Sequence, residues 1–259
     1  MTVKIKKHSG LCTFLLLLII IFFCAYDLDY SAFNTFSWAN FTSTVKQLFH
    51  PDFNYFYDGS GEDVFSLILL TIAIAFAGTT IGTILAIPFT LLASSNLWSN
   101  SIVPRIGKII LDILRAFPEL IYAIIFVKVV GPGAFAGMLA IGVHQIGMLG
   151  KLFTEEMEKM NETPVEACKS VGANSVQTMF YARIPELLPI YSSLILNHFE
   201  IGVRSASTLG LVGAGGIGAT LIFAIQARNW DKVSIILLSV IVTVYVLDII
   251  TGIIRKKLR

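Results

Sequence analysis

The stretch FSLILLTIAIAFAGTTIGTILAIPFTLLA, residues 65–93, contains no charged residue. A helix needs about 20 predominantly apolar residues to cross the roughly 30 Å hydrocarbon core of a bilayer, so this stretch predicts a membrane-spanning helix. The rest of the chain has the same character, because 55% of its 259 residues are hydrophobic and 14% are charged. A soluble domain has about 25% charged residues. We therefore predict a protein that crosses the membrane several times.

Six apolar runs are long enough to span a bilayer, namely 11–28, 65–93, 107–130, 133–152, 187–209 and 233–253. The expected fold is an all-α, polytopic membrane helix bundle with six transmembrane helices. The basic start before the first run would also suit a signal peptide, but no small-residue cleavage site follows, so we expect an uncleaved span. We divide the chain into residues 1–64, a first transmembrane helix with an acidic outer loop, and residues 65–259, the core.

Lysine and arginine are distributed unevenly between the loops, which predicts the orientation of the chain. With the N-terminus in the cytoplasm, the outer side receives only Lys46, Lys128, Arg228 and Lys232. Six spans then return the C-terminus to the cytoplasm, and the polar loop at 153–186 also faces the cytoplasm.

Within this loop, the sequence TPVEACKSVGANSVQTMFYARIP predicts two short helices joined by a tight turn. Thr163 and Glu166 have the spacing of a capping box, and Gly172 suits a left-handed helix stop. Asn174 is a candidate cap for the second helix, and Pro185 is expected to block its continuation. The pair has an apolar face without an obvious partner in the chain, made by Val165, Cys168, Val171, Val176, Met179 and Phe180.

The same segment resembles the pattern E-A-A-x3-G-x9-I-x-L-P, which in permeases of ABC importers forms the cytoplasmic loop that docks into an ATPase subunit. The positions that match are Glu166, Ala167, Cys168, Gly172, Ala182, Ile184 and Pro185. Cys168 replaces the second alanine, Ala182 the isoleucine and Ile184 the leucine. The resemblance implies that these residues couple the chain to a cytoplasmic ATPase, as a pair of coupling helices. The alternative is that Glu166 only caps a helix and Gly172 only ends one.

Three further stretches resemble the phosphonate-type branch of these permeases, at residues 115–140, 142–158 and 199–221. This resemblance implies import of phosphonate, phosphite or a related small phosphorus oxyanion. It also implies an extracytoplasmic substrate-binding protein, a second permease copy that is identical or paralogous, and the bacterial inner membrane with its lipids. The glycine-rich run VGAGGIG, residues 212–218 of the last stretch, also resembles methionine-type permeases, which leaves a methionine-type importer as an alternative.

A charged side chain in mid-membrane costs roughly 2.5–3.5 kcal/mol on insertion scales, so such residues should be few and paired. Arg115 with Glu119, and Glu200 with Arg204, have i,i+4 spacing, which places each pair on one helix face. These four residues and His144 are candidates for lining the translocation pathway or its gates, with Arg204 expected in the outer half. The alternative is that the pairs are structural clamps and that His144 is a core hydrogen-bond donor.

The run VGAGGIG supplies a group of glycines, Gly213, Gly215, Gly216 and Gly218. No predicted strand precedes it and no acidic residue follows at the spacing of a dinucleotide site, so we exclude a phosphate cradle. We expect a kinked, close-packed end of the fifth span, outside the membrane. There it would help to form an outer gate or contact a binding protein.

The sequence lacks the motifs that several kinds of chemistry require. There is no G-x4-G-K-[ST] motif, so ATP must be hydrolysed by a partner, and no histidines or carboxylates have metal-ligand spacing. We expect no cofactor, no metal and no nucleic-acid partner. An intramembrane enzyme is disfavoured because the spans contain no G-x-S-x-G, no paired aspartates and no metal set. An ion-driven secondary transporter remains a rival, with Glu200, His144 or Asp248 as proton sites.

Overall fold

The computed structural model describes residues 4–26, 37–57, 59 and 61–258, and within them it contains helices and no strands. The chain forms two compact units, Met1–Lys46 and Gln47–Arg259. Residues 47–64, which the sequence analysis grouped with the N-terminal part, therefore belong to the second unit. The all-α fold expected from the sequence is confirmed.

The first unit contains helix α1, Lys4–Tyr26, whose described apolar side chains from Phe14 to Phe23 are exposed. Helix α3, Trp38–Leu48, continues into the second unit and was not predicted. It carries apolar residues at helical spacing within a segment that the sequence analysis treated as a loop. The remainder of that outer loop lies partly outside the described residues.

In the second unit, three helices are long and apolar enough to cross a membrane: α4, Val64–Ala93; α7, Ala134–Lys159; and α12, Trp230–Leu258. A fourth path consists of the helical segment 175–212, which contains α10, Ile184–Leu209, followed by α11, Ile217–Gln226, with a bend of 45° between them. By length and composition the described residues thus offer three spans, or four with the bent pair, and not the six continuous helices expected.

The predicted third span, 107–130, is broken in the middle. Helix α5, Ile102–Ala116, ends before Phe117, and α6, Glu119–Val130, begins after Pro118. Proline has no backbone N–H and forces the preceding residue into an extended conformation, and Phe117 has φ −86° and ψ 127°. Pro118 has no N–H to donate to the carbonyl of Leu114, four residues earlier. This carbonyl instead accepts a hydrogen bond of 2.8 Å from the Tyr122 hydroxyl.

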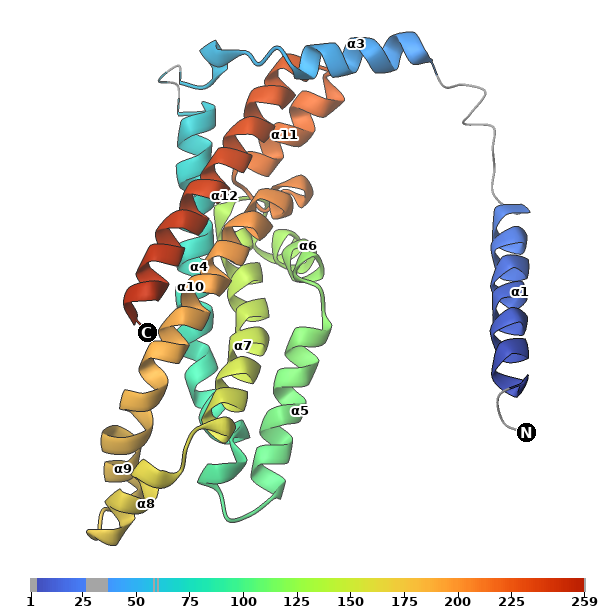
Figure 1. Ribbon diagram of the computed structural model, residues 1–259. Helices are drawn as coiled ribbons and strands as arrows, with labels where there is room; N and C mark the ends of the chain where they lie inside the picture. The colour runs from blue at the N-terminus through green and yellow to red at the C-terminus, as the bar shows by residue number, and fades with distance from the viewer. Residues whose placement is uncertain (1–3, 27–36, 58, 60, 259) are drawn as a thin grey trace. The chain divides into compact units, whose positions relative to one another are not determined.

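Helices α4 and α7 run parallel and in close contact (Figure 1). A methyl group placed on Gly78 would lie 2.9 Å from Ile141, and one placed on Gly82 would lie 2.5 Å from Gln145. A step of four residues along α4, from Gly78 to Gly82, matches a step of four along α7, from Ile141 to Gln145, so the two helices run in the same direction. Because glycine has no side chain, the two backbones can approach closely. Since α4 and α7 run the same way, the broken α5–α6 segment must carry the chain back from the end of α4 to the start of α7.

Helix α12 begins near the start of α4, where Val64, Val233 and Ile236 are buried in one cluster. The connection before α4 is tied to the same place, because the backbone N–H of Asp52 donates to the carbonyl of Asp231 at 3.3 Å. A second cluster joins α4, α6, α7 and α10 through Ile74, Ala123, Ile141, Val203 and Leu209. The bundle core therefore lies among α4, α7 and α10. The short helices α8, Thr163–Ser170, and α9, Ser175–Thr178, lie at the end of the molecule opposite α11 (Figure 1).

Candidate functional site

The segment 163–185 contains the expected pair of short helices, α8 (Thr163–Ser170) and α9 (Ser175–Thr178). Gly172 between them has φ +85°, the left-handed conformation predicted for it. Asn174 caps α9 as expected: its side chain accepts from the N–H of Gln177 at 2.8 Å, and its own N–H donates to the Gln177 side chain at 2.9 Å. The turn between the two helices is thus fixed by local hydrogen bonds.

The predicted capping box at the start of α8 is wrong. Glu162 occupies the cap position without a side-chain cap bond, and Thr163 is the first helical residue. The Thr163 hydroxyl instead donates to the side chain of Asn161 at 2.8 Å, and the Thr163 N–H donates to the same oxygen at 3.1 Å. The short Asn161 amide, two residues earlier, competes successfully for the groups that a threonine cap would have used.

Pro185 does not stop the second helix as expected. Helix α9 passes through a π turn, Met179–Arg183, directly into α10. Within this turn the N–H of Ile184 donates to the carbonyl of Met179, five residues earlier. A π turn widens the backbone next to Pro185, which lies in the first turn of α10, where a missing N–H is tolerated. The segment is consequently continuous with a membrane helix.

Most of the residues that match the permease pattern are accessible. Ala182 is buried and Cys168 is half-buried, whereas Glu166, Ala167, Gly172, Ile184 and Pro185 are exposed. The predicted apolar face is partly buried and partly exposed: the side chain of Val165, on α8, is fully buried, whereas other apolar side chains of the segment are exposed. The open ones include Val171, which is 84% exposed, and also Val176, Phe180 and Tyr181.

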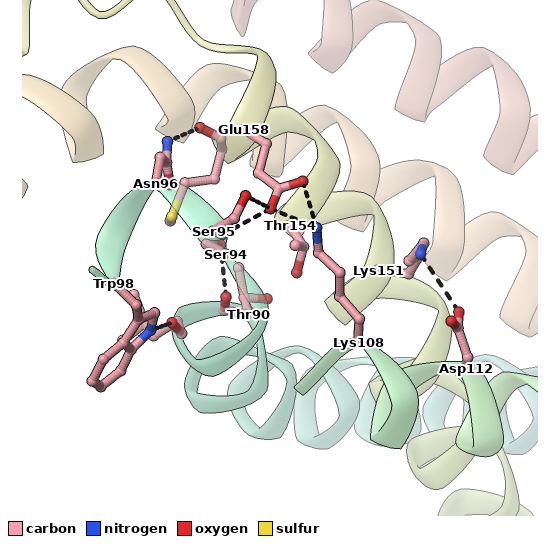
Figure 2. A network of polar contacts seen from close by, with 12 residues as sticks. Thr90, Ser94, Ser95, Asn96, Trp98, Lys108, Asp112, Lys151, Thr154 and Glu158 are labelled. Carbon is pink, nitrogen blue, oxygen red and sulfur yellow. Dashed lines mark hydrogen bonds and ion pairs between the residues drawn. The ribbon is translucent and has the colours of Figure 1, made fainter. Parts of the chain in front are cut away.

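Behind this segment, Glu158 in the last turn of α7 gathers donors from two other elements (Figure 2). Its Oε1 accepts 2.8 Å and 2.6 Å hydrogen bonds from the backbone N–H and the hydroxyl of Ser95, in η2 (Ser95–Leu97). The Nζ of Lys108, on α5, lies 2.8 Å from the same oxygen. One carboxylate therefore joins α7, the α4–α5 connection and α5.

A second carboxylate, Glu162 at the start of α8, continues this network. The Asn96 amide donates to the Met157 carbonyl at 2.7 Å and to Glu162 Oε1 at 3.2 Å. The guanidinium of Arg183, whose side chain is only 6% exposed, lies 3.4 Å from Glu162. We call these residues the inner clamp: Ser95, Asn96, Lys108, Glu158, Glu162 and Arg183. The sequence analysis missed it, because its members come from four separate segments.

An apolar groove of about 620 Å³ opens beside the inner clamp. It lies between the end of α4, the end of α7 and the α9–α10 stretch, with Trp98, Phe153, Phe180 and Tyr191 in its lining. The indole N–H of Trp98 donates to the carbonyl of Leu91 at 2.9 Å, which fixes this ring at the wall of the groove.

Of the membrane-embedded pairs, Glu200 and Arg204 on α10 meet as their spacing predicts, at 3.1 Å. Glu200 is buried, and it is also approached by Arg255 of α12, at 3.5 Å, which the sequence analysis missed. Arg255 lies near the C-terminal end of α12 and also faces Asp248 at 3.8 Å. Glu200 and Arg204 are therefore near the level of that end, and the depth of Arg204 in the membrane, expected in the outer half, stays a prediction.

The other expected pair does not form. Arg115 lies in the last turn of α5 and Glu119 begins α6, so the break at Pro118 separates them. Arg115 pairs instead with Asp112, one turn earlier, at 3.2 Å, and Lys151 of α7 lies 3.5 Å from the same carboxylate. His144, the remaining candidate, is half-buried on α7, and its Nδ1 is buried without a hydrogen-bond partner among the described residues.

The glycine-rich segment forms the break between α10 and α11. Gly213, Gly215 and Gly216 have φ values of +85°, +80° and +76°, which other residues rarely adopt. The Gly133 N–H donates to the Gly213 carbonyl at 2.9 Å, so the break packs on the start of α7. Close packing is as expected, but the segment interrupts an apolar path instead of ending it, because the apolar helix α11 follows.

Among the described residues, no group of three or more histidine, cysteine or acidic side chains could hold a metal ion. The arrangement has two notable features. The exposed helix pair α8–α9 is anchored to several membrane helices, and the buried carboxylate of Glu200 is shared by two arginines.

Comparison with known proteins assigns this architecture. Residues 78–259 match the family described as binding-protein-dependent transport system inner membrane component. The chain belongs to this family and is a transport component of the membrane.

Its relatives include a phosphite transport system permease protein, PtxC, of Stutzerimonas stutzeri, 35% identical over 73% of this chain and 69% of the relative. A putative phosphite transport system permease protein of the same organism, HtxC, is 35% identical over 82% of this chain and 74% of its own length. A phosphate-import permease protein, PhnE, of Mycolicibacterium smegmatis is 35% identical over 78% of this chain and 38% of its own length.

Solved structures of more distant proteins share the fold. A chain of the inward-facing MetNI methionine ABC transporter superposes with a TM-score of 0.64 at 20% identity, over 74% of this chain and 94% of that one. A chain of an amino acid ABC transporter gives a TM-score of 0.62 at 15% identity, over 86% of this chain and 99% of that one. The fold of ABC transporter permeases is thereby shown.

Proposed function

We propose that this chain is the permease subunit of an ATP-driven importer for phosphite, phosphonate or a related small phosphorus oxyanion. The observation that carries the proposal is the 35% identity to two phosphite transport permeases over most of the chain. A methionine import permease of Bacillus subtilis is less similar, at 27% identity over 64% of this chain, and it marks the alternative substrate class.

The proposed topology has both termini in the cytoplasm. Helices α4, α7 and α12 cross in one direction, and the broken α5–α6 segment and the bent α10–α11 path cross in the other, with α1 as the first span. The direction of α4 relative to α7 supports this count, since the α5–α6 segment has to return the chain between them. The segment 163–185 then faces the cytoplasm.

In this arrangement the segment 163–185 couples the permease to a separate ATPase. The exposed Glu166 and the apolar side chains of Val171, Val176 and Tyr181 form a contact surface that suits a groove on a partner. The chain has no P-loop motif, so the partner hydrolyses ATP. The continuity of α9 with α10 would convey movement of the docked helices into the bundle.

The pathway forms between this chain and a second permease copy, and an external binding protein delivers the substrate. Arg204 is the strongest pathway candidate among the charged residues, because its side chain is 59% exposed while Glu200 beneath it is 11% exposed. An exposed guanidinium on a membrane helix suits an oxyanion, which it can bind with two parallel hydrogen bonds. The break at Gly213–Gly218 is proposed to contribute to the outer gate.

Uptake measurements test the function directly. The chain is expressed with its ATPase and its binding protein in bacteria lacking their own phosphonate uptake, and accumulation of phosphite, methylphosphonate and methionine is followed. We expect phosphite or methylphosphonate to accumulate only when the ATPase is present, and to continue when the proton gradient is collapsed in ATP-supplied vesicles. Methionine uptake would establish the alternative importer, and uptake without the ATPase would establish a secondary transporter.

Sided labelling tests the orientation. In a variant with Cys12 and Cys24 replaced by serine, Cys168 is the only thiol, and it is half-buried on α8. A membrane-impermeant maleimide should label it in inside-out vesicles and leave it unlabelled in intact spheroplasts. Labelling in intact spheroplasts would contradict the proposed topology.

A further inference from the structure

The inner clamp connects the segment 163–185 to helix α5, a connection that the proposed function does not by itself require. Helices α5 and α7 run antiparallel and are joined by two ion pairs along one seam (Figure 2). Lys108 lies 2.8 Å from Glu158, and Asp112 lies 3.5 Å from Lys151. Two attachment points fix both the position and the direction of α5 on the second half of α7.

Glu158 is the central residue of this connection. Its three donors, two from Ser95 and one from Lys108, hold the last turn of α7 to the α4–α5 connection and to α5 itself. A carboxylate that accepts several charged or backbone donors forms short, strong hydrogen bonds, and the observed distances of 2.6–2.8 Å agree. Helix α8 begins only a few residues later, at Thr163.

Glu162 extends the connection to both helices of the exposed pair. Asn96 holds it from the α4–α5 connection, and the buried Arg183 holds it from the π turn between α9 and α10. Removing the partner of a buried charge is costly, so Arg183 keeps Glu162 in place. The start of α8 and the end of α9 therefore share one anchor.

The rigid part ends at the break between α5 and α6. Helix α5 stops at Ala116, and Phe117 is extended before Pro118. Helix α6 then packs on α7 and belongs to the central core through Ala123. A displacement passed to α5 can be absorbed at Phe117–Pro118 while α6 stays with the core, because loop residues between helices take up such changes of φ and ψ.

We propose that the inner clamp is the link through which displacement of the segment 163–185 moves α5 about a hinge at Phe117–Pro118, with Glu158 as its central positioning residue. The inference rests on the proposed function, since it describes how ATP-driven motion at the exposed helix pair reaches the bundle. It adds that the ion pair between Glu158 and Lys108 sets how much transport each hydrolysed ATP yields.

The test uses the full complex of permease, ATPase and binding protein in proteoliposomes, with methylphosphonate and phosphite as the transported probes. ATP hydrolysis and uptake are measured together for E158Q, K108M, the double variant and the matched control E155Q. Glu155 lies on the same helix but is half-exposed, and among the described residues it pairs with Lys159 alone, at 3.5 Å. Glutamine at position 158 can still accept from Ser95, so E158Q removes mainly the ion pair.

We expect E158Q and K108M each to lower uptake per ATP hydrolysed about tenfold while hydrolysis stays within about twofold of the unaltered complex. The double variant should be no worse than either single one, because all three lack the same pair. E155Q should match the unaltered complex in both measurements.

An unchanged uptake-to-hydrolysis ratio in E158Q and K108M would overturn the proposal. So would a parallel fall of both activities in proportion to the amount of assembled complex, because that is the signature of a purely structural contact. If E158Q does not assemble, K108M decides alone, since it leaves the Ser95 contacts intact. Failure of the proposed function can be told apart from failure of the inner-clamp proposal, because in the first case even the unaltered complex would show no ATP-driven uptake of either probe.

Discussion

Arg255, near the end of α12, lies 3.5 Å from the carboxylate of Glu200 in α10, and Arg204 lies 3.1 Å from the other oxygen of that carboxylate. One buried acid is thus shared by an arginine of its own helix and one from a helix that is distant in sequence. The arrangement places two counter-charges beside the buried Glu200 and holds α12 against α10. It also leaves Arg204 the more exposed of the two arginines.

Replacing Glu200 by glutamine should weaken this link and leave two arginines without their shared counter-charge. We expect the free energy of unfolding to fall by about 1–2 kcal/mol, less than for a fully buried pair because both arginines are partly exposed. The measurement is the thermal unfolding midpoint of the purified protein in detergent. D248N is the control, with an expected change below about 0.5 kcal/mol, because Asp248 is 58% exposed. Equal effects of the two variants would contradict this assignment.

The close approach of α10 and α11 at the glycine-rich break predicts that a larger residue at Gly218 destabilises the protein. A methyl group on Gly218 would lie 2.0 Å from the carbonyl oxygen of Ser207, a contact with backbone that no side-chain rotation can relieve. G218A should therefore cost at least about 2 kcal/mol, at the upper part of the range for overpacking. G252A is the matched control, because no atom lies within 4 Å of the added methyl group and alanine favours the helix. Detergent-solubilised G218A with unaltered thermal stability would show that this packing is not formed.

The pathway role of Arg204 gives a third prediction. In R204L the assembled complex should be recovered in normal amount, since Arg255 still neutralises Glu200. Uptake of phosphite or methylphosphonate should fall at least about tenfold, which corresponds to 1.4 kcal/mol in affinity for the passing oxyanion. R204K should retain part of the activity because it keeps the positive charge. Full uptake in R204L would contradict a role of Arg204 in the pathway.

Local sequence patterns predicted the features that depend on neighbouring residues. The left-handed Gly172, the cap at Asn174 and the Glu200–Arg204 pair all follow from spacing within one or two helical turns. The helical, membrane-spanning class followed from composition and from uncharged runs such as residues 65–93. The family followed from the motif in segment 163–185, and the match over residues 78–259 agrees.

Features that depend on competition or on distant segments were missed. The sequence allowed Thr163 to cap α8, but the neighbouring Asn161 took the same hydrogen bonds. Pro185 was expected to end a helix, yet a π turn accommodates it. Arg115 and Glu119 had the correct spacing for a pair, and the proline between them separated their helices. The inner clamp and the Arg255 contact join residues at least 21 positions apart, and no local pattern reports such contacts.

The central claim is that the segment 163–185 is the surface through which a separate ATPase drives this permease, and co-purification tests it most directly. The permease is affinity-purified after co-expression with its ATPase, as the unaltered chain, as E166R, as G172V and as the control E155R. Glu166 and Gly172 are exposed, and valine at 172 would strain a backbone with φ +85°. We predict that the ATPase is recovered with the unaltered chain and with E155R, and that at least nine-tenths of it is lost with E166R and G172V. Full recovery of the ATPase with both variants would contradict the account.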